Sequence, residues 1–307
     1  MEISIVIPVY NKAAYLDGCL GSLLQQDFDE FEIVCVDDGS TDNSGTICDQ
    51  WAAQDQHVRV VHTTNGGVTS ARRTGVEAAR GRYVLFVDAD DQLLPGALTV
   101  LHQAIEQSQA DEVIATFITH EGAASPVVYQ GLTSPDPLIR AIITSKNRFP
   151  VLWGIIFRRD LLDGVLDTPR EIIEGEDKLM QVKILVKQPR VYFIPQPVYC
   201  YTIGLPNSRH HTLEHEQQYD RLLQQTLGAR AADFADALTL HKLKEYERFI
   251  SDGVFSVRKA YYKSAVGSLS SAVIPLYDRL VFALPPVLAR PVIRLYRRII
   301  TIKQKGL

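Results

Sequence analysis

Residues 83–91 read Tyr-Val-Leu-Phe-Val-Asp-Ala-Asp-Asp, and they are the most informative part of this sequence. Its five apolar and aromatic residues predict a buried β-strand, which runs directly into the carboxylates of Asp88, Asp90 and Asp91. Ligands of α/β folds bind at such carboxyl ends of strands. Neighbouring carboxylates repel each other, and Mg²⁺ or Mn²⁺ bound to a diphosphate would relieve that repulsion. The alternative is a solvated acidic turn, or the N-cap of a helix at Pro95.

Two more predicted strands end in polar turns. Residues 3–7 lead into Pro8-Val9-Tyr10-Asn11, and residues 32–36 lead into the segment Asp37-Asp38-Gly39-Ser40-Thr41-Asp42. Because the carboxyl ends of parallel strands meet at one edge of a sheet, the three turns are expected to converge. Their convergence favours a nucleotide or metal site over an isolated acidic turn.

Residues 1 to about 118 alternate between strand and helix patterns. Repeated βα units predict an α/β fold with a mainly parallel central sheet and helices on both faces. Further strands are predicted at residues 58–62 and 112–117. The predicted helices span residues 12–26 with Asn11 as N-cap, 43–53 with Thr41 or Asp42 as cap, 69–79 after the glycine turn Asn65-Gly66-Gly67, and 95–107.

The pattern is looser after residue 120. Short helices are predicted at 137–144 and from Arg159, an amphipathic helix at 178–186, and separate extended segments at 190–194 and 198–202. Residues 153–157 are predicted to be extended or a loop. Residues 213–270 are rich in Gln, Ala and Leu and predict a helical region.

The composition is that of a globular protein: 307 residues, 46% hydrophobic and 22% charged, with a net charge of −4. This balance gives no indication of a nucleic-acid partner. The four cysteines, Cys19, Cys35, Cys48 and Cys200, form no CxxC pair and predict free thiols in a reducing compartment. The sequence shows no signal peptide and no transmembrane helix, so a cytoplasmic protein is expected.

Six segments occur in a characteristic order: Ile5–Asn11, Val36–Asp42, Ser70-Ala71-Arg72, Asp88–Asp91, Gly175-Glu176-Asp177 and Tyr199-Cys200-Tyr201. Together they resemble the inverting family 2 glycosyltransferases of GT-A fold, in particular the bacterial enzymes of capsular and exopolysaccharide synthesis. The resemblance covers about residues 1–210. It implies a catalytic domain over 1–210, with a nucleotide-sugar-binding half (1–118) and an acceptor half (119–210), followed by a helical C-terminal region (211–307).

The resemblance also implies the roles of the residues around the donor, most often a UDP-sugar. Asp38 would pair with the uracil, where its carboxylate can accept the imide N–H; the alternative is turn capping, which fits Asp42 better. Asp88, next to Ala89, would lie near the ribose, and Asp90 would bind Mn²⁺ or Mg²⁺. Asp91 would support the site or cap the next helix. The other nucleotide-binding residues would be Pro8, Tyr10, Asn11, Ala89 and Arg72.

Two of these assignments have a plain structural alternative. Tyr10 offers a flat face to the base, and the alternative is that it packs in the core. Arg72 could reach the nucleotide, or form a surface salt bridge instead. The family pattern often continues Ala-Arg-Asn, whereas this chain has Arg73.

Asp177 is the predicted catalytic base, and Glu176 is the second choice. An inverting transfer needs one carboxylate to take the proton of the acceptor hydroxyl as the oxygen attacks C1. The alternative is that these acids stabilise the helix dipole, because they precede a helix. The chain departs from the family at Ile155, where relatives often carry lysine in a Trp-x-Lys-Leu-Tyr-like segment. Trp153 in the same segment could stack on a sugar or belong to the core.

The C-terminal tail, about residues 271–307, changes character. From Arg279 to the end there are seven Lys or Arg and no acid. Val292, Leu295, Tyr296 and Ile299 follow helical spacing, and a basic amphipathic helix is typical of membrane-surface binding. The alternative is a helix packed on the catalytic domain or on a second subunit of a homodimer. Membrane binding fits the acceptors implied by the resemblance, a glycan or a polyprenyl-diphosphate-linked sugar at the inner face of the cell membrane.

Three other classes of protein are alternatives to a glycosyltransferase. A sugar nucleotidyltransferase would want a glycine-rich basic loop after the first strand, and Pro8-Val9-Tyr10-Asn11 is not one. A catalytically degenerate nucleotide-sugar-binding scaffold stays open because of Ile155, although Asp38, Asp88, Asp90 and Asp177 are intact. A dinucleotide dehydrogenase is disfavoured because no GxGxxG follows a strand.

Overall fold

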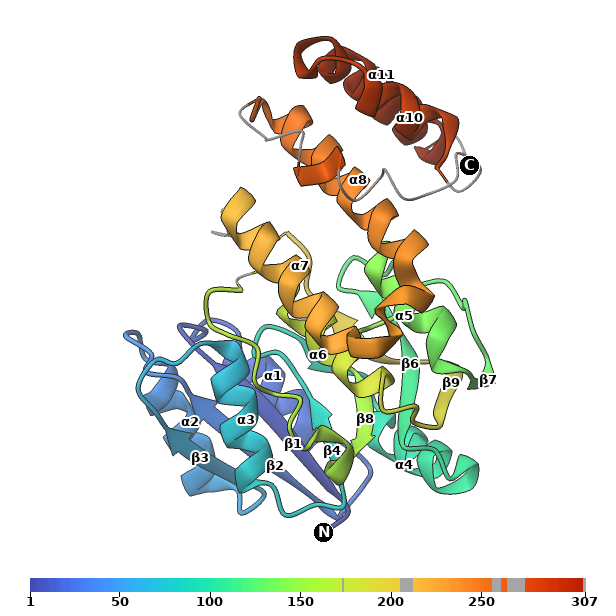
Figure 1. Ribbon diagram of the computed structural model, residues 1–307. Coiled ribbons are helices and arrows are strands. Elements are labelled where there is room, and N and C mark those ends of the chain that lie inside the picture. The colour runs from blue at the N-terminus through green and yellow to red at the C-terminus, as the bar shows by residue number, and fades with distance from the viewer. Residues whose placement is uncertain (173, 205–211, 256–260, 264–273, 306–307) are drawn as a thin grey trace. The chain divides into compact units, whose positions relative to one another are not determined.

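The structure is a computed structural model, and it describes residues 1–172, 174–204, 212–255, 261–263 and 274–305, with side chains of the last range described to residue 298 (Figure 1). The chain forms two compact units. The first comprises Met1–Ile139 and Asn147–Leu227, and the second comprises Arg140–Lys146 and Gly228–Leu307. Each unit is described by itself.

The N-terminal half of the sheet is parallel. Its strands are β1 (Ile3–Val9), β2 (Phe31–Asp37), β3 (Val58–His62) and β4 (Tyr83–Phe86), in the spatial order β3-β2-β1-β4. Val9 lies opposite Asp37, and Val6 lies opposite Phe86. The carboxyl ends of β1, β2 and β4 therefore meet at one edge of the sheet, as the sequence predicts.

The other half of the sheet mixes directions. Strand β8 (Ile155–Arg158) lies between β4 and β6 (Glu112–Thr119) and runs antiparallel to both. Strand β9 (Val191–Tyr201) runs parallel to β6. The short strands β5 (Gln92–Leu93) and β7 (Gly131–Thr133), which the sequence did not predict, pair antiparallel with β9. The α/β fold with a central sheet is confirmed, and these antiparallel strands complete it.

Strand β9 corrects one prediction. Two separate extended segments were expected because Pro195 and Pro197 interrupt the pattern, yet a single strand spans residues 191–201. Proline lacks the N–H that a ladder needs and is tolerated at bulges. The register with β6 shifts on both sides of Thr116, which lies opposite Pro197, and the Thr116 hydroxyl donates to the Pro195 carbonyl at 2.8 Å.

Helices cover both faces of the parallel strands. Helices α1 (Leu16–Leu24), α2 (Ser44–Gln54) and α4 (Ala97–Ser108) share one core with Ile3, Ile5 and Ile7. Helix α3 (Val68–Ala78) covers the other face, where Ala71 packs with Val34 and Val36. Gly75 permits this close approach, because a Cβ there would lie 2.2 Å from a methyl carbon of Val6. Helices on both faces are therefore confirmed.

Several helix starts differ from the prediction. Asn11 is not the N-cap of α1, which begins at Leu16; Asn11 has a φ of 52°, and its side-chain oxygen accepts the N–H of Thr41 at 2.8 Å. Helix α4 begins at Ala97, two residues after Pro95. The N-cap of α2 is Asn43 and not Thr41 or Asp42 as predicted, although Asp42 accepts the N–H of Ser44 at 2.9 Å. The chain leaves β1 in an ordered loop before its helix starts.

The remaining helices have the following bounds: α5 (Pro135–Ile143), the 3₁₀ turn η1 (Arg159–Leu162), α6 (Glu176–Leu185), α7 (Leu213–Leu227), the 3₁₀ turn η2 (Gly228–Phe234), α8 (Ala235–Asp252), α10 (Leu276–Ala283) and α11 (Pro286–Lys305). In the second unit α8 packs against α10 and α11. None of the helices in the described part of the chain combines the length and the apolar character that crossing a bilayer requires. The four cysteines are free thiols, as predicted.

The residues through which α11 packs differ from those of the predicted apolar face. Among the side chains of this helix that the structure describes, Ala289 and Ile293 are buried, whereas Leu295 is 62% and Tyr296 is 41% exposed. The side chain of Ile299, which belonged to the predicted face, lies outside the described residues. Helix α11 therefore packs through one narrow face and leaves large apolar side chains in solvent.

Candidate active site

A pocket of about 770 Å³ opens at the carboxyl ends of β1, β2 and β4 in the first unit. All the residues predicted for the site line it except Asn11. The lining residues include Pro8, Tyr10, Lys12, Asp38, Asn65, Gly66, Gly67, Arg72, Asp88, Ala89, Asp90, Trp153, Arg170, Glu176, Asp177, Tyr201 and Thr202. The volume is in the range of small-molecule and cofactor sites.

The end of β1 contributes an exposed aromatic ring. Tyr10 is 46% exposed, which excludes the alternative that it packs in the core. Asn11 instead ties two loops together, because its backbone N–H donates to Ser40 at 3.1 Å and its side chain accepts from Thr41. The loops after β1 and β2 are thereby held in one arrangement around the pocket mouth.

Asp38 organises the turn that faces it. Its carboxylate accepts the backbone N–H groups of Gly66 and Gly67, each at 2.8 Å, and the side chain is almost fully buried. Its partners thus lie in the loop after β3 and not in its own turn. Arg170 holds the same loop from the other side, donating to the carbonyl oxygen of Asn65 at 2.9 Å and to its side-chain oxygen at 2.6 Å. Arg170 was not predicted for the site, because about a hundred residues separate it from Asn65 along the chain.

Arg72 is buried, which rules out the surface salt bridge weighed above. The side chain is 4% exposed, and one guanidinium nitrogen, Nη2, donates to Asp88 at 3.0 Å. The other two nitrogens, Nε and Nη1, have no hydrogen-bond partner among the described residues. Buried charged donors are normally satisfied, so this guanidinium is suited to an anionic or carbonyl-bearing ligand.

Asp91 anchors the cluster from behind. It is 1% exposed and accepts the N–H of Thr202 at 2.7 Å and the hydroxyl of Tyr199 at 2.9 Å. The same hydroxyl accepts the N–H of Asp88 at 3.1 Å. Burial, together with the charges of Asp88 and Asp90, raises the pKa of Asp91 to about 7. Asp91 therefore supports the turn and does not cap a helix.

Asp90 lines the pocket together with Asp88. Its side chain is 18% exposed and forms an ion pair with Lys12, and its carbonyl accepts the Thr202 hydroxyl at 2.6 Å. Carboxylate oxygens are the ligands that Mg²⁺ and Mn²⁺ prefer, and Mg²⁺ commonly binds one or two carboxylates plus phosphate oxygens. Asp90 fits that donor set. Lys12 was missed because a single lysine in a turn carries no sequence signal.

The opposite wall comes from the start of α6. Gly175 has a φ of +85°, and a Cβ there would lie 2.8 Å from the ring of Tyr219, so the position requires glycine. Glu176 is 5% exposed, whereas Asp177 is less buried and accepts the N–H of Lys178 at 2.8 Å. Both carboxylates line the pocket. Asp177 is the more accessible of the two to a substrate.

An aromatic wall completes the pocket. The rings of Trp153 and Tyr201 stack with centroids 5.1 Å apart and planes at 6°, and Tyr199 lies behind Trp153. Burial, and then the surrounding carboxylates, raise the pKa of the Tyr201 hydroxyl. Ile155, where the family often has lysine, is fully buried in β8. That position therefore faces the protein interior in this chain.

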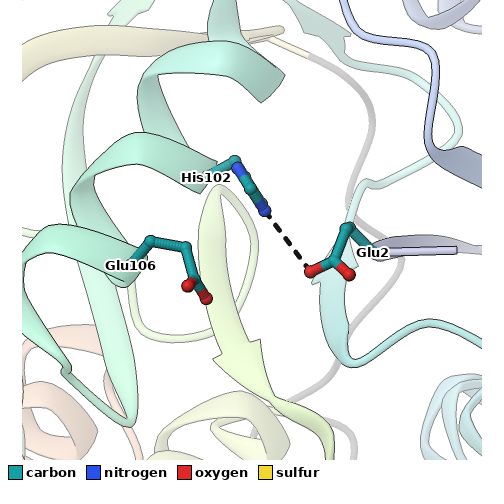
Figure 2. A group of neighbouring side chains, drawn as sticks. All are labelled: Glu2, His102 and Glu106. Carbon is teal, nitrogen blue, oxygen red and sulfur yellow. Dashed lines mark hydrogen bonds and ion pairs between the residues drawn. The ribbon is translucent and has the colours of Figure 1, made fainter.

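A second group of metal-type side chains lies elsewhere, as Figure 2 shows for Glu2, His102 and Glu106. Glu2 directly precedes β1, so the group lies at the amino ends of the strands, away from the pocket. His102 contacts Glu2 at 3.4 Å, and Glu106 accepts from Arg82 at 2.7 Å and from the Tyr83 hydroxyl. These contacts account for the group as an ion-pair network.

Comparison with known proteins agrees with this architecture. The solved structure of residues 1–349 of TarS from S. aureus in complex with UDP superimposes with a TM-score of 0.68 at 25% identity, covering 97% of this chain and 92% of that one. The same fragment in complex with UDP-GlcNAc gives a TM-score of 0.70 at 24% identity, covering 100% and 92%. The fold, with its pocket at the ends of parallel strands, is that of the GT-A class.

The sequence comparisons narrow the class to a family. The family model for glycosyl transferase family 2 matches residues 4–166, more than half of the chain. EpsJ of Bacillus subtilis (strain 168), described as an uncharacterized glycosyltransferase, is 33% identical over 67% of this chain and 62% of its own length. The poly(ribitol-phosphate) beta-glucosyltransferase of Bacillus spizizenii is 31% identical over 66% of this chain and 32% of its own length. The chain belongs to glycosyl transferase family 2, and it spans less than two thirds of these relatives.

Proposed function

We propose that this protein is an inverting glycosyltransferase that moves a sugar from a UDP-sugar to a hydroxyl of a glycan or lipid-linked acceptor in cell-surface polysaccharide synthesis. The observation that carries the proposal is Arg72, a buried guanidinium with two unsatisfied nitrogens, beside Asp88 and Asp90 in a pocket at the strand ends. Such a combination suits a diphosphate held with a divalent cation. The UDP and UDP-GlcNAc complexes of TarS support the choice of nucleotide.

The donor half of the pocket supplies a partner for each part of UDP. The ring of Tyr10 and the adjacent Pro8 would contact the base, and Asp38 would accept the uracil imide N–H with a lone pair left over from its glycine contacts. Asp88 would bind the ribose next to Ala89. Asp90 would hold Mn²⁺ or Mg²⁺, which when bound would neutralise the departing diphosphate and orient it.

Asp177 would act on the acceptor as general base. It would accept the proton of the attacking hydroxyl while the acceptor oxygen bonds to C1 of the sugar and the bond from C1 to UDP breaks. The proton ends on Asp177, and the electron pair leaves with UDP, so no separate acid is required. The stacked rings of Trp153 and Tyr201 would offer a flat apolar surface on which a sugar ring in the pocket could stack.

The second unit would bring the enzyme to its acceptor at the cytoplasmic face of the membrane. Among the side chains of α10 and α11 that the structure describes, five large apolar ones are more than half exposed: Leu276, Leu280, Val287, Leu288 and Leu295. Arginines at 279, 290, 294, 297 and 298 accompany them, with no acid after Asp278. An apolar helix surface with basic flanks favours an anionic lipid interface.

The membrane proposal predicts that the double variant Leu288→Glu, Leu295→Glu loses binding to vesicles containing phosphatidylglycerol, by about tenfold or more, since each leucine contributes on the order of 1–2 kcal/mol when buried. Co-sedimentation measures the bound fraction. Leu132→Glu is the matched control, because Leu132 in β7 is 59% exposed in the first unit. Equal binding of the double variant and the wild type would remove the proposal.

The donor proposal predicts that UDP binds the purified protein at least about tenfold more tightly with Mn²⁺ than without it, because the cation joins Asp90 to the diphosphate. Isothermal titration calorimetry measures both affinities, with ADP and GDP as control nucleotides. If UDP fails to bind in either condition while the protein is folded, the donor assignment is wrong. Equal affinity with and without Mn²⁺ would keep the nucleotide and reject the metal.

A further inference from the structure

The three acids that follow β4 are compensated in three different ways. Asp88 pairs with the buried Arg72, and Asp91 is held by Tyr199 and Thr202 away from solvent. Asp90, which lines the pocket with Asp88, has Lys12 as its ionic partner. The carboxylate that would receive a metal is therefore already in contact with a cation of the protein.

The backbone of Lys12 is fixed while its side chain retains room. Its N–H donates to the Ser44 hydroxyl at 2.8 Å, and its carbonyl accepts the N–H of Tyr15 at 2.9 Å, so the loop is tied to the starts of α1 and α2. The Lys12 side chain is 33% exposed and lines the pocket, with its ammonium 5.8 Å from the Tyr15 ring centre. A flexible four-carbon stem on a rigid base can carry its charge between two nearby anions.

We propose that Lys12 is a built-in counter-cation of Asp90 that competes with the divalent metal in the absence of donor and moves to the donor diphosphate when metal and nucleotide bind together. This inference rests on the proposed function of Asp90. A divalent ion and an ammonium cannot share one carboxylate oxygen at low cost, because like charges at contact distance repel. Nucleotide adds negative charge that accommodates both cations.

The competition has a consequence that a passive ion pair does not have. Metal alone binds weakly because it must displace Lys12, and diphosphate binds strongly because Lys12 and metal both contact it. Binding of Mn²⁺ and UDP is therefore synergistic, and removal of the Lys12 charge affects the two ligands in opposite directions.

The variant Lys12→Met tests this on the full chain. Its affinity for Mn²⁺ alone, measured by electron paramagnetic resonance of the free ion, should rise about threefold to tenfold, as expected when a partly exposed ion pair no longer competes. Its affinity for UDP at saturating Mn²⁺, measured by calorimetry, should fall about tenfold or more, as expected for loss of a charged hydrogen bond. Lys12→Arg should restore most of the UDP affinity.

Two further variants make the result specific. Lys183→Met removes a comparable Lys–Asp pair, with Asp167, outside the pocket lining, and should leave both affinities unchanged. In Lys12→Met, Asp90→Asn the gain in Mn²⁺ affinity should vanish, because the contested carboxylate is gone. A general folding defect would instead lower the affinity of Lys12→Met for both Mn²⁺ and UDP.

Unchanged or weaker Mn²⁺ binding by Lys12→Met overturns the competition, and unchanged UDP binding overturns the transfer to diphosphate. Titration of the wild-type protein with UDP tests the proposed donor function separately. If the wild type binds UDP with Mn²⁺ and Lys12→Met does not differ from it, the inference fails and the function stands. If the wild type binds no UDP but Lys12→Met still gains Mn²⁺ affinity through Asp90, the function fails and the competition stands.

Discussion

Asp177→Asn is expected to lower the rate of sugar transfer by about 10²–10⁴-fold, the range that a positioned general base contributes. The amide keeps the size of the carboxylate and an oxygen that can accept the N–H of Lys178, so the start of α6 should survive. UDP affinity should change by less than about twofold, because the residue acts on the acceptor side. Single-turnover transfer and UDP calorimetry measure the two effects.

Glu176→Gln is the matched control for this prediction. Glu176 precedes Asp177 in the same helical turn but is 5% exposed, so a group that must meet the acceptor is expected at Asp177. If Asp177→Asn keeps full activity and Glu176→Gln loses it, the base is Glu176. If both keep full activity, no carboxylate of α6 is the base.

The parallel half of the fold was predictable because its signals are local. Strands β1 to β4 are short, mainly apolar runs, and each is separated from the next by a helix, so their parallel direction follows from the βα connections. The same locality placed most of the site. Pro8 lies near the end of β1, Asp38 follows β2 directly and Asp88 lies two residues after β4. Strands that meet at one edge bring such residues together.

The other half depends on contacts between distant segments. Strand β5 has two residues, and it exists because β9, over a hundred residues away, pairs with Gln92 and Leu93. The two prolines of β9 hid its continuity, since only the bulge opposite β6 makes room for them. No local pattern encodes either pairing.

The unpredicted site residues were hidden for the same reason. Lys12 and Arg170 lie in loops, and their roles depend on Asp90 and Asn65, which belong to other parts of the chain. The burial of Arg72 was equally nonlocal, because it results from the close packing of α3 that Gly75 allows. A sequence pattern can indicate that an arginine reaches a site, but only packing decides how many of its donors stay unsatisfied.

Asp90→Asn is expected to abolish the Mn²⁺ dependence of UDP binding and to lower transfer by at least about 100-fold, since a neutral amide oxygen is a poor ligand for a hard cation and the leaving diphosphate loses its counter-charge. The fold should be almost unaffected. The ion pair that is lost, Lys12 with Asp90, is 33% and 18% exposed, and such pairs contribute about 1 kcal/mol or less. Thermal unfolding and metal-dependent calorimetry on the same sample measure both.

The variant Asp88→Asn is the control that distinguishes loss of the metal ligand Asp90 from loss of any other acid in this turn. Its partner Arg72 is 4% exposed, so removing the Asp88 charge leaves a buried guanidinium poorly compensated and should lower stability by on the order of 1–3 kcal/mol. The Asp90→Asn variant should therefore unfold at nearly the same temperature as the wild type, but its UDP binding should not depend on Mn²⁺. The Asp88→Asn variant should unfold at a lower temperature, while Asp90 can still bind the metal. If UDP binding by Asp90→Asn still depends on Mn²⁺, the metal is bound by another carboxylate. A marked loss of stability in Asp88→Asn would then indicate that Asp88 is engaged with Arg72 and is not available as the metal ligand.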